Sequence, residues 1–127
     1  MAEGLIVRKG GTQLTVNSFD SDQTTQGSAL TVNSGLVGTK KKGIVTGYIV
    51  GANTNTPTLT CTFFGSNDGT TFTQIGTALS IQKTGSVTAG KIDSKEFDAT
   101  GYTYFRVTTN SISGGLSFGY GVSMSLV

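Results

Sequence analysis

The most constraining feature of this sequence is a strict alternation of large and small residues near its end. Between residues 116 and 126, large apolar side chains occupy every even position, and serine or glycine occupies every odd one. A period of two places all the large groups on one face of a β-strand, whereas an α-helix would spread them around its axis. The alternation therefore predicts a strand with one buried face. We expect its small face to meet solvent, or another chain that comes close.

Shorter segments repeat this pattern. In residues 58–63, three threonines oppose Leu59, Cys61 and Phe63. In residues 102–107, one face carries Thr103, Phe105 and Val107, and the other carries Tyr102, Tyr104 and Arg106. We also expect a central strand over 44–50 and short strands over 72–75, 79–81 and 92–97.

The turn-forming residues between these segments are typical of an antiparallel β protein. The sequence SNDG at residues 66–69 predicts a tight turn, because the glycine tolerates the positive φ that such a turn needs. No segment carries a helical stripe with caps. We therefore predict an all-β antiparallel sandwich, either a jelly roll or an immunoglobulin-like fold, since periodicity does not encode strand order.

The chain length of 127 residues fits one structural domain. Residues 1–42 are less apolar than the rest, so we expect them to form an N-terminal extended arm or hairpin. Residues 43–127 are expected to form the sandwich core.

The composition excludes several classes of catalytic and metal-binding site. Without histidine and with one cysteine, the chain has no Ser-His-Asp or Cys-His unit, no histidine-ligated metal and no internal disulfide. The acidic pairs Asp20–Asp22 and Glu96–Asp98 have the spacing of residues that share a strand face, but such pairs are most often solvated. We expect no enzyme, metal or cofactor. The net charge of +2 and the absence of a long apolar run predict neither a nucleic-acid nor a membrane partner.

Four motifs together resemble small β-sandwich structural proteins of tailed bacteriophages. They are TPTLTCTF at 56–63, GSNDGTTFTQI at 65–75, YTYFRV at 102–107 and GLSFGYGVSMSL at 115–126. The resemblance implies a virion structural protein, made in the host cytoplasm, that acts as a capsid decoration or cement protein on the capsid exterior. It also implies the major capsid protein as partner and a homotrimer as the assembly state. A carbohydrate- or receptor-binding module on a head fibre or tail, and a tail-tube or connector subunit, are the alternatives.

Two sets of residues are candidates for binding. The run Leu5, Ile6 and Val7 has the composition to add a strand to a partner's sheet, with Arg8, Lys9, Lys40, Lys41 and Lys42 facing acidic residues of the shell. Alternatively, the apolar run is a strand of the protein's own sheet, and the lysines lie on an exposed turn or edge and protect the sheet from accidental pairing. Tyr102 and Tyr104, on one strand face, form a possible stacking surface for a saccharide, with Tyr48 and Tyr120 as further exposed aromatic residues.

Overall fold

The structure is a computed structural model that describes residues 2–7, 14–23, 26–27, 29–50, 58–82, 91–113 and 118–127. Side chains are described at 29–49, 58–82, 91–111 and 120–127. Within these ranges the regular elements are all β-strands, so none of the residues described belongs to a helix that could cross a membrane.

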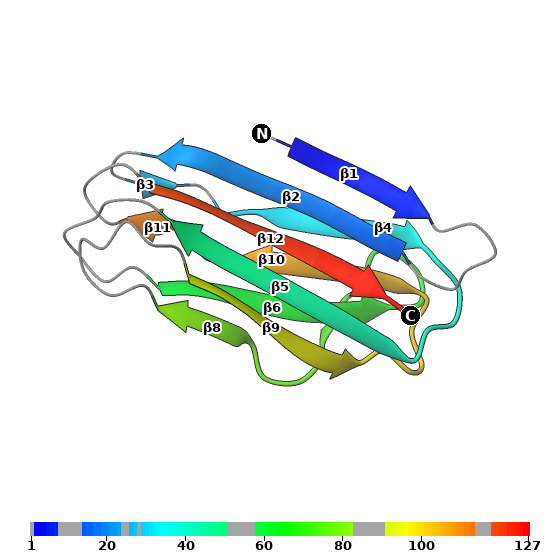
Figure 1. Ribbon diagram of the computed structural model, residues 1–127. Coiled ribbons are helices and arrows are strands. Elements are labelled where there is room, and N and C mark those ends of the chain that lie inside the picture. The colour runs from blue at the N-terminus through cyan, green and yellow to red at the C-terminus, as the bar shows by residue number, and fades with distance from the viewer. Residues whose placement is uncertain are drawn as a thin grey trace.

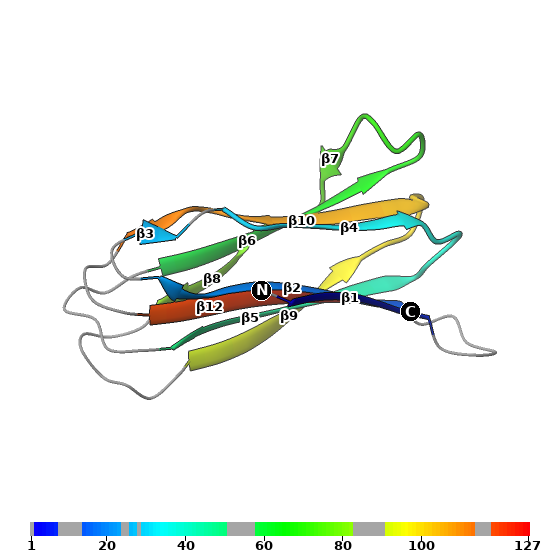
Figure 2. The ribbon, with the colours of Figure 1, turned by 90° about the horizontal axis from the view of Figure 1, so that it is seen from above.

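Two antiparallel sheets lie face to face as the layers of a sandwich (Figures 1 and 2). The first sheet has the spatial order β1 (Ala2–Val7), β2 (Leu14–Gln23), β12 (Phe118–Leu126), β5 (Lys42–Val50) and β9 (Lys91–Asp98). The second has the order β4 (Thr31–Leu36), β10 (Tyr104–Thr109) and β6 (Thr58–Ser66), and β6 then pairs with both β7 (Thr73–Gln74) and β8 (Leu79–Gln82). The short strands β3 (Gln26–Gly27) and β11 (Ile112–Ser113) pair with each other. The predicted all-β sandwich is confirmed.

The strand order identifies the sandwich as a jelly roll. The chain folds like a long hairpin wrapped around the core: β2 pairs with β12, β4 with β10, β5 with β9 and β6 with β8. This nesting of early strands with late ones is the double Greek key of a jelly roll. It settles the choice that periodicity alone left open.

The core lies between the two sheets and is supplied by the alternating strands. Every second residue of β12 from Tyr120 to Leu126 is at most 3% exposed. Leu59, Cys61 and Phe63 of β6 are 0% exposed, as their alternation with threonine predicted. At one end of the core, the Phe63 ring stacks between Phe97 and Phe105, with ring centroids 4.9 and 5.6 Å away.

Two glycines of β5 let the sheets approach one another. A Cβ atom at Gly43 would lie 2.5 Å from Cζ of Phe63, and one at Gly47 would lie 2.9 Å from Cδ1 of Ile81. Ordinary carbon–carbon contacts are about 3.5–4.0 Å. Side chains of the second sheet therefore fill the space that β5 leaves open.

The segment 1–42 contributes strands to both sheets. β1 and β2 pair antiparallel, in agreement with the expected hairpin, and β2 continues into the first sheet by pairing with β12. β4 forms an edge of the second sheet beside β10. The division of this one domain into an arm and a core after residue 42 stays a prediction, and strands on both sides of that position share both sheets.

Candidate functional site

The lysine turn, which consists of Lys40, Lys41 and Lys42, is less exposed than we expected. Lys40 is only 9% exposed, so the expectation of an exposed turn is wrong for this residue. Lys42 begins β5, and its Nζ lies 3.6 Å from Oε2 of Glu96 on the neighbouring strand β9. Lys41 is exposed, and its backbone N–H donates to the carbonyl of Val127 at 2.8 Å. Its ammonium makes no ion pair with any residue that the structure describes.

The apolar run at residues 5–7 lies in β1, which is a strand of the protein's own sheet. Leu5, Ile6 and Val7 pair in register with Val16, Thr15 and Leu14 of β2, and β1 is the outermost strand of the first sheet. Arg8 and Lys9 lie outside the described residues.

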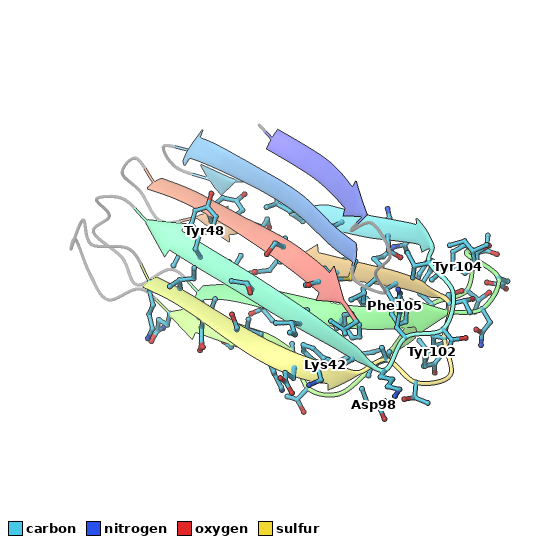
Figure 3. The ribbon with its side chains drawn as sticks, turned by 45° about the vertical axis from the view of Figure 1, so that its right-hand side comes forward. Lys42, Tyr48, Asp98, Tyr102, Tyr104 and Phe105 are labelled. Carbon is cyan, nitrogen blue, oxygen red and sulfur yellow. The ribbon has the colours of Figure 1, made fainter. Side chains whose placement is uncertain are left out.

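Pairing between strands places the end of β1 and the lysine turn at the same end of the first sheet. The row of paired residues runs from Val7 through Leu14 and Leu126 to Gly43, which follows Lys42. Three strand spacings of about 4.8 Å correspond to a separation of about 14 Å. Figure 3 shows Lys42 and Asp98 at this end.

The prediction that Tyr102 and Tyr104 share a strand face is wrong. β10 begins only at Tyr104, and Tyr102 packs against the core, where a Cβ at Gly65 would meet its ring at 2.5 Å. The ring of Tyr104 instead lies over Gly69, whose φ of 77° allows the turn after β6. Both tyrosines lie at one end of the sandwich in Figure 3. Gly65 pairs with the buried Phe105 and so lies on the inner side of the sheet, which places the Tyr102 ring on that side. Tyr120 is 0% exposed, so the expectation that it is an exposed aromatic residue is also wrong.

Arg106 is held in a fixed position on the outer face of the second sheet. Its Nε donates to Oδ1 of Asn33 at 2.7 Å, and its guanidinium carbon lies 3.9 Å from the centroid of the Phe72 ring. We call Asn33, Phe72 and Arg106 the arginine corner. Sequence reasoning missed it, although Arg106 alternates with buried residues and so had to face outward. No pattern in the sequence indicated that Phe72 folds back onto Arg106.

The loop that carries Phe72 projects from the second sheet on the side away from the first (Figure 2). We call residues 66–76 the projecting loop. Asp68 Oδ1 accepts hydrogen bonds from the backbone N–H groups of Thr71 and Thr70 at 2.8 and 2.9 Å and from the Ser66 hydroxyl at 2.9 Å. These bonds hold the pKa of Asp68 well below its usual range, with the Thr71 amide as the largest cause. Asn67 Nδ2 also donates to the Gly101 carbonyl at 2.9 Å, which ties the loop to the turn before β10.

Several of the titratable groups described are held in structural contacts. Glu96 pairs with Lys42, and Asp98 accepts from the Thr100 amide at 2.9 Å, which lowers its pKa. Burial raises the pKa of Cys61 to about 12, so its thiol stays protonated and is a poor nucleophile. Among the residues described, no three carboxylate or thiol groups come together to hold a metal ion. The side chains of Asp20 and Asp22 lie outside the description.

Comparisons with known proteins show the fold. No family model matches the chain, and no curated protein matches it. The structure of infectious bursal disease virus, Gx strain, matches with a TM-score of 0.51 and 12% identity over 90% of this chain and 31% of that chain. The enzymatically active domain of tailspike protein 4 of bacteriophage CBA120 matches with a TM-score of 0.50 and 7% identity over 91% of this chain and 15% of that chain. This chain thus spans less than a third of either protein, and at these identities the likeness establishes a shared β-sandwich.

Proposed function

We propose that this protein is a virion structural protein that decorates the outside of an assembled phage head. The observation that carries the proposal is the position of the edge strand β1 and the lysine turn at one end of the same sheet. The resemblance of residues 56–126 to phage structural proteins supports it, and so does the sandwich fold shared with a virus structure and a phage tailspike. The proposed role is binding alone, with no catalytic step.

In the proposed binding mode, the major capsid protein supplies a strand that pairs with the outer edge of β1. Strand addition obtains affinity from main-chain hydrogen bonds, which an edge strand can still form. Lys41 then faces an acidic residue of the shell. Binding to the assembled shell, and not to free subunits, would stabilise the shell by about 2.7 kcal/mol per site at a hundredfold excess over Kd.

Self-association as a homotrimer completes the proposal. A trimer that bridges neighbouring capsomers makes its second and third contacts intramolecular, which raises avidity without new contacts. Sedimentation equilibrium of the purified chain measures this directly, and a hexameric ring would instead favour the tail-tube alternative.

The test of decoration is co-sedimentation with purified phage heads. We expect hundreds of copies per head, and a Lys41→Glu variant should bind about tenfold more weakly because it places like charges together. Lys91→Glu is the matched control, since Lys91 is also exposed but begins β9 at the opposite end of the first sheet. A folded wild-type chain that does not sediment with heads would overturn the proposal. Equal losses in the two variants would remove the lysine turn from it.

The arginine corner favours a second candidate function, which is the binding of saccharides at the virion surface. Aromatic rings and polar side chains gather there on one outward face. Phe64 and Asn33 flank Arg106 on the neighbouring strands, and Thr108 follows two positions along β10. Aromatic rings stack on the apolar faces of sugars, and hydroxyl and amide groups bind sugar hydroxyls.

A further inference from the structure

We propose that the arginine corner binds a saccharide that carries a carboxylate, with Arg106 as the carboxylate-binding residue. The inference rests on the second candidate function and names its ligand class. It follows from three features of Arg106. Among the described residues, its guanidinium has donors without a partner and no carboxylate pairs with it, and it lies on the face of a sheet.

The guanidinium of Arg106 is oriented but only partly used. Of its five N–H donors, the one on Nε is bonded to Asn33, and the Phe72 ring covers one face of the plane. The donors on its two Nη atoms make no hydrogen bond to any residue that the structure describes. They form a planar fork that matches the two oxygens of a carboxylate, and the fork is already fixed in place before a ligand arrives.

No carboxylate neutralises Arg106 within the described part of the chain. The ion pair found there joins Lys42 to Glu96 on the first sheet. Asp68, at the base of the projecting loop, directs Oδ1 to Ser66, Thr70 and Thr71 instead. An arginine that is partly buried, stacked and without a counter-charge among the described residues is complementary to an anionic ligand.

The place of Arg106 in the sheet favours a saccharide over a peptide. β10 is paired on both edges, by β4 and by β6, so a peptide has no free strand edge to join at Arg106. A ligand must therefore approach the face of the sheet, where it meets side chains only. Those nearest in register are Asn33 and Phe64, with the paired threonines Thr108 and Thr62 in the next outward row. The Phe72 ring of the projecting loop lies against the Arg106 guanidinium beside this row.

The test is an NMR titration of the full chain with matched acidic and neutral saccharides. The probes are trigalacturonate against its methyl ester, and sialyllactose against lactose, each up to about 10 mM. We expect at least one acidic probe to shift the Nε–H signal of Arg106 and the amide signals of Phe72 and Thr108, with affinity at least tenfold above that of its neutral partner. Arg106→Lys should lose that preference, because lysine keeps the charge but not the fork. Lys91→Gln, which removes a charge elsewhere on the surface, should retain it.

The possible outcomes separate the inference from the function on which it rests. Equal binding of acidic and neutral probes, unchanged in Arg106→Lys, overturns the carboxylate role and leaves saccharide binding in place. Absence of shifts with all four saccharides overturns both. Shifts at the same residues with hexaglutamate, and none with saccharides, assign the corner to an acidic peptide and also overturn both. Near-uv circular dichroism of each variant verifies that it is folded.

Discussion

Adding one methyl group at Gly43 is expected to destabilise the sandwich through a single ring. The new Cβ would lie 2.5 Å from Cζ and 2.9 Å from Cε1 of Phe63, about 1 Å closer than carbon atoms normally approach. Phe63 cannot withdraw easily, because it is 0% exposed and stacked between Phe97 and Phe105. The ring that the new methyl group would contact therefore has little freedom to move away.

The expected cost can be worked from these contacts. Overpacking a core by one carbon costs about 1–3 kcal/mol. Replacing glycine by alanine recovers about 0.4–1 kcal/mol, because it restricts the unfolded chain. The net loss for Gly43→Ala is then about 0–2.6 kcal/mol, and its midpoint of about 1.3 kcal/mol corresponds to a fall in Tm of about 5 °C for a domain of this size. Urea unfolding followed by circular dichroism measures it.

A second substitution distinguishes this explanation from a general intolerance of alanine in β5. Phe63→Leu shortens the obstructing side chain, so Gly43→Ala should cost nearly nothing in that background. Gly47→Ala is the matched control and should cost less than Gly43→Ala, because its nearest contact is Cδ1 at the flexible end of Ile81. If Gly43→Ala destabilises the chain equally with Phe63 and with Leu at position 63, the reasoning from the ring contact is refuted.

Three further predictions concern single side chains. Ser34→Ala should cost about 1–3 kcal/mol in urea unfolding, because the buried Ser34 hydroxyl accepts the Phe105 amide at 2.9 Å, and an equal stability would contradict this. The pKa of Asp68 is lowered in the folded state, so its stabilising effect is complete above its ordinary pKa of about 3.9 and is lost as the pH falls through the folded value. Hydrogen exchange of the Thr71 amide, corrected for intrinsic rate, should therefore accelerate from pH 5 to pH 3 and lose this dependence in Asp68→Asn. Because burial raises the pKa of Cys61 to about 12, a thiol reagent at pH 8 should label Cys61 only in urea, and rapid labelling of the folded protein would refute this.

Much of the fold could be predicted from the sequence because strands such as β6, β10 and β12 bury every second residue. The alternation that ends at Leu126 and the one around Cys61 each set which side chains enter the core, and every large apolar residue predicted to lie there is buried where the structure describes its side chain. Gly69 was identifiable because a tight turn needs a positive φ. Strand partners were not identifiable, since main-chain hydrogen bonds are the same for every residue type.

The candidate site was harder to predict because it depends on contacts between distant segments. Tyr102 leaves the expected strand face because Gly65, 37 positions earlier, leaves room for its ring on the inner side of the sheet. Arg106 and Phe72 meet because the projecting loop folds back over the sheet. Neither contact leaves a local pattern in the sequence, so both could be identified only from the three-dimensional structure.

The position of β12 has a consequence for how the chain acquires its shape during synthesis. This strand comes last in sequence among the described strands, yet it lies third of five in its sheet, where Gly121 pairs with Phe19. Until the ribosome has released β12, β2 and β5 lack the neighbour that joins them. Contacts between residues so distant in sequence form slowly. We therefore expect the polar threonine- and serine-rich faces of the strands to limit aggregation of the nascent chain before the sheet can close.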